Sequence, residues 1–490
     1  MSLEISVVAL GLLVLLADLW LPAERRRALG YAAAAVLGLL FLNSFTSHCS
    51  CALSGEAFGG MFVQDALAVF FKRLFLLTGA LILLLAVEFS DRIAAGVSEY
   101  YSLIIFALAG MLFAASANDF VMLFVSIELI TITFYVLTSF TRGKVAALEA
   151  GVKYLILGAL SSAFMVYGIA LVYGTTGTMA FDGLAQKLAM SDRLVHSHEP
   201  AHQPLLRLGL LLVLVGLGFK IAAFPFQIWA PDVYQGAPTP TTAFLAVGSK
   251  AAGFVLLLRV LFCVVPDVTA HWETLLIVVS GVTILYGNLC ALPQRNLKRL
   301  LGYSSIAHAG YLLLGVAALA GDRESAGGSA ALFYLGGYLF TTLAAFAVLV
   351  LVMRHLDDED IGDLAGLNQR SPLLATTMTL AMVSLAGIPP LAGFFGKFLL
   401  LKAVIEQGAV NHGYYCLAFT ALAGVVISLY YYFGVVRAMY WGRNGHGAPP
   451  IAISYPMKFA LGVCIAGMFW LGVFPGAVIG LATEAVRVLK

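Results

Sequence analysis

Apolar runs of about 20 residues recur along nearly the whole chain, and they restrict its fold more than any other feature. A helix needs about this length to cross the hydrocarbon core of a bilayer, and about 14 such runs can be counted. Backbone groups in lipid must satisfy their own hydrogen bonds, so the runs should be helical. The sequence therefore predicts an all-α polytopic membrane protein with about 14 transmembrane helices.

Composition and charge agree with that class. The 490 residues are 61% hydrophobic and 11% charged, whereas soluble domains carry about 25% charged residues. A net charge of +2 is too small to predict a surface that binds nucleic acid. The N-terminal run lacks a basic start and a clear small-residue cleavage site, so we interpret it as the first span and not as a signal peptide.

Basic residues in the predicted loops indicate an orientation. The side that contains Arg25, Arg26 and Arg27 also contains most of the other loop Lys and Arg residues. Cytoplasmic loops carry an excess of these residues. We therefore expect this side to be cytoplasmic and both termini to lie outside.

Signals for metal and cofactor binding are weak or missing in the sequence. His48, Cys49 and Cys51 lie together in SHCSC, but a structural metal site needs about four ligands. We expect free thiols there, since a disulfide between two such close cysteines would be strained. The sequence contains no GxGxxG after a strand, no Walker loop, no CxxC set and no haem-attachment motif. We therefore expect no metal or cofactor in this chain.

Two parts of the chain match each other at an offset of about 180 residues. Tyr154 aligns with Tyr334, and Glu128 aligns with His308. The steady offset predicts a duplication of five spans, and an odd number of spans makes the two copies inverted. The predicted organisation is spans 1–3 in residues 1–96, a first repeat in 97–266, a second repeat in 267–442, and a last span in 443–490.

Prolines interrupt corresponding spans of the two predicted repeats. The seventh run contains Pro225 and leads into Pro231, and the twelfth contains Pro389 and Pro390. Transporters with inverted repeats commonly place their site near the bilayer midplane, beside interrupted helices. The sequence therefore predicts broken helices at spans 7 and 12.

Ionisable residues lie within the apolar runs on successive spans. Each costs at least about 2.5–3.5 kcal/mol at the bilayer centre, so each needs a reason. Lysine suits proton relay because desolvation and a nearby carboxylate act on its protonation in opposite directions. Taken singly, each could be a static ion pair, a snorkelling amine or a core histidine. Together they predict a midplane row for proton transfer, formed by Glu128, Lys153, Lys220, Lys250, His308 and Lys397.

Several of these stretches together resemble one family. The segment GFKIAAFPFQIWAPDVYQGAPTPTTAFLAVGSK (218–250) is similar to the central segment of the antiporter-like membrane subunits of respiratory complex I and of the related Mrp antiporters. EAGVKYLILGALSSAF, QRNLKRLLGYSSIAHAGYLL and SLAGIPPLAGFFGKF extend the resemblance over spans 4 to 13.

The resemblance implies roles for matching residues. Glu128 corresponds to the family's span-5 glutamate, which pairs with the span-7 lysine, here Lys220. Lys250 corresponds to the connecting lysine of span 8, and Lys397 to the span-12 lysine on the outward side. Lys153 and His308 match polar positions of the family.

The resemblance also implies partners, cofactors and a location. PDVYQ at 231–235 departs from the Pro-Asp-Ala-His pattern of sister subunit M, and no long C-terminal extension like that of sister subunit L follows span 14. Both features favour the third antiporter-like subunit of the complex. Subunit M and the small subunit K would be its neighbours, and NADH, FMN, iron–sulfur clusters and quinone would be bound by other subunits. The expected location is the bacterial inner membrane.

Two other functions are compatible with the same residues. A monovalent cation/proton antiporter subunit of the Mrp type would share most of the motifs. A membrane scaffold that conducts nothing would contain the buried charges as static pairs.

Overall fold

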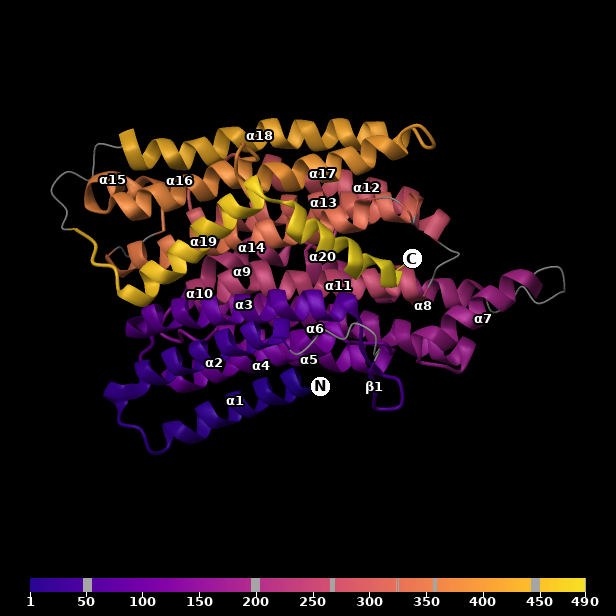
Figure 1. Cartoon of the computed structure of the whole chain (residues 1–490), viewed down its shortest axis with the longest axis horizontal. Coiled ribbons are helices and arrows are strands. Elements are labelled where there is room, and N and C mark those ends of the chain that lie inside the picture. The colour runs from indigo at the N-terminus through magenta and orange to yellow at the C-terminus, as the bar shows by residue number, and fades with distance from the viewer. Residues whose placement is uncertain are drawn as a thin grey trace.

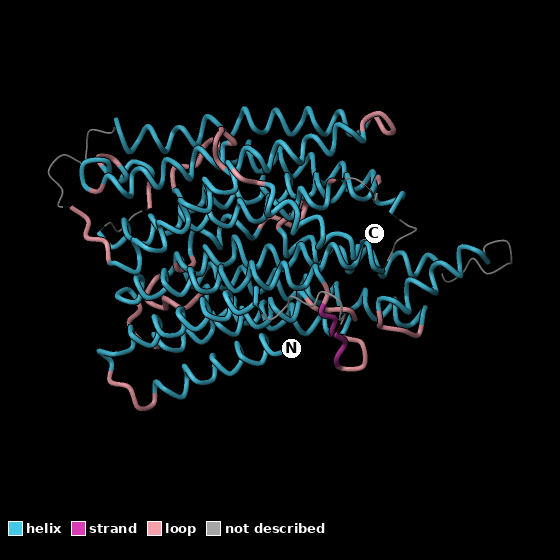
Figure 2. Tube along the Cα trace, viewed as in Figure 1, coloured by secondary structure: helices cyan, strands magenta, loops and turns pink. Residues whose placement is uncertain are grey.

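The computed structural model describes residues 1–46, 55–194, 203–264, 269–322, 324, 326–355, 359–441 and 450–489. Its helices run side by side, and α7 projects from one end of the bundle (Figure 1). Loop segments lie at the two ends of the bundle and also within it (Figure 2). The SHCSC loop with His48, Cys49 and Cys51 lies outside the described residues.

The N-terminal part forms three antiparallel helices and a short hairpin. Its elements are α1 (Ser2–Asp18), α2 (Arg26–Thr46), β1 (Gly55–Ala57), β2 (Phe62–Gln64) and α3 (Ala66–Phe89). Asp65 caps α3 by accepting a hydrogen bond of 2.7 Å from the Ala68 backbone N–H, which satisfies one of the donors that every helix start exposes.

The next part covers the first predicted repeat. Its helices are α4 (Val97–Ala115), α5 (Phe120–Thr138), α6 (Val145–Thr176), α7 (Phe181–Leu194), α8 (Gln203–Ile221), α9 (Trp229–Gly236), α10 (Thr239–Phe244), the π-helical η3 (Leu245–Ser249), α11 (Lys250–Arg259) and the π-helical η4 (Val260–Val264). Helices α10, η3, α11 and η4 follow one another without a break and are almost entirely buried.

The remaining helices cover the second predicted repeat and the C-terminal part. They are α12 (Thr269–Ala291), α13 (Leu297–Gly321), α14 (Gly327–Val352), α15 (Leu367–Arg370), α16 (Pro372–Ala386), α17 (Ala392–Gln407), α18 (Gly413–Trp441), α19 (Tyr455–Val473) and α20 (Gly476–Val486). Short 3-10 turns lie at Ala23–Arg25, Ser90–Arg92, Met353–His355, Ile361–Leu364 and Arg487–Leu489.

The prediction of an all-α multi-pass membrane protein is confirmed. Within the described residues, 12 helices are long and apolar enough to cross a membrane. The other two predicted spans correspond to α1, which has 17 residues, and to the α16/α17 pair, which is interrupted. The count of 14 and the inversion of the repeats remain predictions.

Both predicted helix breaks are present. Helix α8 ends at Ile221 and α9 starts at Trp229, whose indole N–H donates to the Phe219 carbonyl at 3.0 Å across the break. Helix α16 ends at Ala386, and the next residue, Gly387, has a φ of 88°, a left-handed conformation that glycine adopts without strain. After this break, a Cβ on Gly393 would lie 1.8 Å from the Ser384 carbonyl oxygen, so the close approach of α17 to α16 requires glycine.

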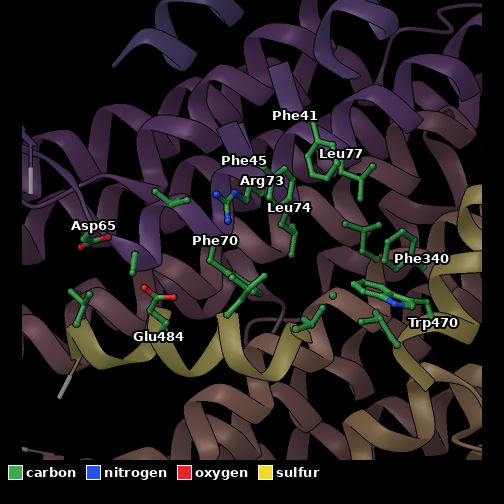
Figure 3. A pocket seen from close by; sticks show the side chains of 18 of the residues that line it. Phe41, Phe45, Asp65, Phe70, Arg73, Leu74, Leu77, Phe340, Trp470 and Glu484 are labelled. Carbon is green, nitrogen blue, oxygen red and sulfur yellow. The ribbon is translucent and has the colours of Figure 1, made fainter. Parts of the chain in front are cut away.

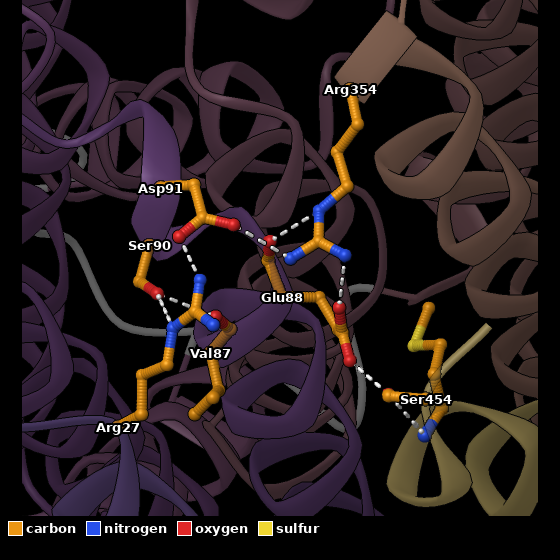
Figure 4. A network of polar contacts seen from close by, with 8 residues as sticks. Arg27, Val87, Glu88, Ser90, Asp91, Arg354 and Ser454 are labelled. Atoms are coloured by element: carbon orange, nitrogen blue, oxygen red, sulfur yellow. Dashed lines mark hydrogen bonds and ion pairs between the residues drawn. The ribbon is translucent and has the colours of Figure 1, made fainter. Parts of the chain in front are cut away.

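An ion network ties the N-terminal helices to the C-terminal half at one end of the bundle (Figure 4). Arg354 after α14 pairs with Glu88 at 2.7 Å and with Asp91 at 3.0 Å. Arg27 also pairs with Asp91, and Ser454 donates to Glu88 while capping α19. The side chain of Glu88 is 4% exposed, whereas that of Asp91 is 55% exposed. The network therefore joins four distant segments through one buried carboxylate and one exposed carboxylate.

A second set of buried charges lies at the opposite end of α3. Lys72 pairs with Glu4 of α1 at 2.6 Å, and both side chains are at most 1% exposed. Arg259 of α11 donates two hydrogen bonds, of 3.0 and 2.9 Å, to Asp65. These pairs join α1, α3 and α11, and the sequence did not predict them.

Candidate functional site

The predicted row begins between α5, α6 and α8. The carboxylate of Glu128 accepts a hydrogen bond of 2.5 Å from the Ser162 hydroxyl on α6. The amine of Lys220, in the last turn of α8, donates to the Thr131 hydroxyl at 2.9 Å. Thr131 lies one turn after Glu128 on α5, so both groups reach the same stretch of that helix. Among the described residues, no ion pair within 4.0 Å joins Glu128 to Lys220, which differs from the expected direct pair.

Lys250 is buried inside the bundle. It is the first residue of α11 and directly follows the π-helical turn η3; π-helical turns often occur at functional sites. Its amine donates to both the carbonyl and the hydroxyl of Ser305 on α13. The same hydroxyl bonds the Tyr234 hydroxyl at 2.9 Å and the Tyr338 hydroxyl at 3.1 Å. Ser305 is therefore a junction where three polar groups from α9, α11 and α14 meet.

His308 lies one turn after Ser305 on α13. Its Nδ1 shares a hydrogen bond with the Tyr334 hydroxyl, and its Nε2 lies 3.1 Å from the Tyr432 hydroxyl. The Tyr338 ring stacks obliquely on the imidazole with a centroid distance of 5.0 Å. Both imidazole nitrogens are thus held by hydroxyls, which can donate or accept as the tautomer requires.

The side chain of Lys397, on α17, extends across the break between α16 and α17. Its amine donates to the Leu385 carbonyl at 2.7 Å and to the Ala386 carbonyl at 3.3 Å, both in the last turn of α16. A helix C-terminus carries a partial negative charge, which favours a cation. The amine also lies 4.8 Å from the centre of the Tyr311 ring. The break in α16 therefore creates the polar site that holds this amine.

These groups fall into two neighbouring sets. One set contains Glu128 and Lys220 with their hydroxyl partners on α5 and α6. The other contains Lys250, Ser305 and Tyr338, whose ring lies against the imidazole of His308. Lys397 approaches this set through the Tyr311 ring, and among the described residues no hydrogen bond joins it to His308. Within the described residues, no hydrogen bond links the two sets, although the stem of Lys220 packs against Gly253 on α11.

Lys153 lies apart from this arrangement. Its side chain is 42% exposed and pairs with Glu149 and Asp232, each at 2.7 Å. Asp232 also pairs with Arg299 at 2.5 Å. The sequence placed Lys153 in the row, but the structure places its amine in a partly exposed ion network on α6, α9 and α13.

The partners of the buried lysines distinguish two groups. Lys72 and Lys298 are each paired with a carboxylate, of Glu4 and Glu359 respectively. Lys220, Lys250 and Lys397 are at most 5% exposed, and each donates to hydroxyl or carbonyl oxygens. A buried amine that bonds a carboxylate cannot lose its proton without leaving that carboxylate unpaired, which is costly. Neutral oxygens impose no such penalty, so the row lysines are suited to changing their protonation.

The hydroxyl partners were not predicted, because the prediction considered only ionisable residues. Helical spacing could have found some of them: Ser304 and Ser305 precede His308 by four and three residues, and Tyr311 follows it by three. Residues three or four apart lie on one helix face. In the part of the chain that the structure describes, no group of three His, Cys, Asp or Glu residues could hold a metal ion. The site consists of amines, one imidazole, one carboxylate and hydroxyls.

Comparison with known proteins agrees with this architecture. Residues 117–427, which contain both breaks and every member of the predicted row, match the family described as NADH:quinone oxidoreductase/Mrp antiporter, TM. The chain belongs to this family.

Relatives within the family resemble the chain over nearly its full length. It is 40% identical to NADH-quinone oxidoreductase subunit N of Desulforamulus reducens, covering 99% of this chain and 97% of the relative. It is 41% identical to the subunit N of Heliobacterium modesticaldum, covering 94% and 93%.

Solved structures of the family share the fold. A chain of respiratory complex I from Thermus thermophilus with bound aureothin is 32% identical with a TM-score of 0.78, and the match covers 98% of this chain and 99% of that one. A chain of the Mrp complex from Dietzia sp. DQ12-45-1b is 21% identical with a TM-score of 0.80, and the match covers 100% and 98%. The latter likeness concerns the fold alone.

Proposed function

We propose that this chain is a proton-translocating, antiporter-like subunit of an NADH–quinone oxidoreductase. The observation that carries the proposal is the set of three buried lysines on three membrane spans, each bonded to neutral oxygens beside a helix break or a π-helical turn. Such groups can accept and release protons, and interrupted helices are tolerated where they line polar space.

The proposed route follows the row. Protons are taken up on the cytoplasmic side near the break between α9 and α10. Glu128 controls the loading of Lys220, the proton passes to Lys250 and His308, and Lys397 releases it outward. In this proposal, the hydroxyls of Ser305 and Tyr338 serve Lys250, and those of Tyr334 and Tyr432 serve His308. The Tyr338 ring lies against the imidazole and brings the two groups close together. In this proposal, Lys153 lies at the edge of the route and affects it through its ion pair with Asp232.

The remaining features of the proposal concern the complex. Relatives that are about 40% identical bear the name NADH-quinone oxidoreductase subunit N, which supports this kind of subunit over the Mrp alternative. The chain would lie beside subunit M and the small subunit K in the bacterial inner membrane, with both termini outside. The inverted repeats at 97–266 and 267–442 would form the conducting unit. Other subunits would bind NADH, FMN, iron–sulfur clusters and quinone, and the free energy of quinone reduction would drive the protons.

A pumping assay on the intact complex tests the proposal. Lys220→Ala and Lys397→Ala should lower the number of protons moved per electron while the complex still assembles. Lys402→Ala is a matched control on the same helix as Lys397, because its side chain is 57% exposed. If both row variants assemble and pump like the wild type, the chain is a scaffold and the proposal is wrong.

A further inference from the structure

An apolar cleft lies outside the midplane row, between the N-terminal helices and the C-terminal ones (Figure 3). Its volume is 610 Å³, and α2, α3, α14, α19 and α20 form its walls. A volume of this size is typical of small-molecule sites. Four lining residues are between 40% and 48% exposed (Phe45, Trp470, Leu481 and Val488), so the cleft opens on the surface that faces lipid.

The interruption between α19 and α20 explains why the cleft exists. Helix α19 ends at Val473 and α20 starts at Gly476, with Pro475 between them. Proline lacks the backbone N–H that would continue the helix. Helix α20 then packs against α3 and the start of α14, where Val486 meets Gly328. The two helices thus cover different parts of α14 and leave an apolar space beside the interruption.

Polar groups line one end of the cleft and apolar groups the other. Asp65, the cap of α3, and Glu484, near the end of α20, lie at one end, whereas Leu77, Phe340 and Trp470 lie at the other (Figure 3). Helix α3 has 24 residues and is about 36 Å long, which exceeds the hydrocarbon thickness of about 30 Å. Its first turn therefore reaches the headgroup level, and the apolar end of the cleft lies deeper in the bilayer.

Arg73 lies between the two ends. Its guanidinium donates to the Ser44 carbonyl at 3.0 Å and lies 4.2 Å from the centre of the Phe45 ring. Ser44 is near the end of α2, so the long side chain extends toward the headgroup level as snorkelling residues do. From the outside inward, the cleft presents a carboxylate, a guanidinium and an apolar space.

The two carboxylates at the outer end differ in whether they can bind a ligand. Asp65 is bound by Arg259 through two hydrogen bonds. Glu484 is exposed, and among the described residues no cation lies within 4.0 Å of its carboxylate. An amine entering from the headgroup region would therefore meet Glu484.

We propose that this cleft binds a zwitterionic aminophospholipid of the phosphatidylethanolamine type. Its ammonium group would face Glu484, its phosphate would face Arg73, and one acyl chain would fill the space beside Leu77 and Phe340. The order of these lipid groups along the bilayer normal matches the order of side chains along the cleft. The deeper part of the cleft is lined by apolar side chains, and acyl chains are the surrounding solvent. The proposal does not depend on the proposed function.

Photo-cross-linking on the intact complex tests the proposal at the site itself. The probe is phosphatidylethanolamine with a photoreactive group in its acyl chain, and the labelled peptides are mapped by mass spectrometry. We expect labelling of α3, α14 and α20 at the cleft. Unlabelled phosphatidylethanolamine should compete about fivefold better than phosphatidylglycerol, because Glu484 interacts favourably with an amine and unfavourably with an anionic headgroup.

Three variants separate the contribution of the apolar space from those of Glu484 and Arg73. Gly336→Phe places a ring in the cleft, since no atom lies within 4 Å of the position of its Cβ, and cleft labelling should disappear. Gly462→Phe on α19 is the matched control, because it is equally open but lies outside the cleft. Glu484→Gln should keep labelling but lose the preference for the amine headgroup. Arg73→Gln should weaken competition by both lipids.

Several results would overturn the proposal. Labelling of the cleft no stronger than on the exposed face of α18 would mean that no lipid is held there. Equal competition by the two lipids in the wild type would remove the headgroup assignment. Labelling of the isolated chain but not of the complex would show that a neighbouring subunit fills the cleft. Because Glu484 is exposed, its variant tests the proposal even if Gly336→Phe does not fold.

Discussion

Replacing Ser305 by alanine removes the junction of the central hydrogen-bond network. In the wild type, its hydroxyl contacts the Lys250 amine, the Tyr234 hydroxyl at 2.9 Å and the Tyr338 hydroxyl at 3.1 Å. The alanine variant keeps the backbone carbonyl that also accepts from Lys250. The substitution therefore leaves the lysine one partner and deprives two buried tyrosines of one partner each.

The expected losses of stability and of proton transfer follow from the hydrogen bonds that Ser305→Ala removes. A buried hydroxyl that loses its partner costs about 1–3 kcal/mol, so the two tyrosines together should lower the free energy of unfolding by about 2–6 kcal/mol. The proposed proton path from Lys250 toward His308 also loses the hydroxyl that accepts from the Lys250 amine. Proton transfer through this subunit should fall at least tenfold, which corresponds to about 1.4 kcal/mol or more in the barrier.

Proton pumping and electron transfer should be measured together in vesicles that contain the complex. We expect Ser305→Ala to lower the ratio of protons to electrons. Ser126→Ala is the matched control, since Ser126 is equally buried but its hydroxyl donates to the Leu123 carbonyl of its own helix at 2.9 Å. A normal ratio in Ser305→Ala, with the variant assembled, would refute the role of this junction.

Further predictions concern the breaks and the buried pairs. Gly393→Ala should prevent α17 from packing against Ser384, and the yield of folded protein should fall well below that of Gly434→Ala, whose Cβ would meet open space. Lys72→Met should lower the thermal midpoint strongly, since it leaves Glu4 buried without its lysine partner at a cost of about 3–5 kcal/mol. Adding Glu4→Gln to that variant should restore part of the loss, and no recovery would contradict the pairing.

The helix breaks could be predicted from sequence because their causes are local. Pro225 and the Pro389–Pro390 pair lie inside apolar runs, where proline removes a backbone donor. The lengths of the runs likewise predicted most of the membrane helices. The 17 residues of α1 and the interruption between α16 and α17 explain why a length criterion finds fewer spans than the predicted number.

The partners of the buried charges could not be predicted because they come from distant parts of the chain. Arg259 bonds Asp65 across 194 positions, and Arg354 bonds Asp91 across 263. Periodicity gives the depth of a residue and the face that it occupies, but it does not identify the helix that faces it. For Lys153 the position near the end of a span could be predicted, whereas the pairing with Asp232 depends on how α6 packs against α9.

The proposed route includes a step between Lys220 and Lys250, which belong to different sets. Within each set the groups lie close together: Thr131 is one turn from Glu128, and Tyr338 bonds Ser305 while its ring lies against His308. Between the sets, the stem of Lys220 packs against Gly253, where an added Cβ would lie 3.3 Å from Cγ of Lys220 and 2.7 Å from Ile221. Glycine at this position brings α8 close to α11 one turn beyond Lys250. Because the backbones are this close, a change in the position of α8 at its break would alter the distance between the two amines directly. In the proposed route, such a movement of α8 is the step that would bring the two amines together or apart.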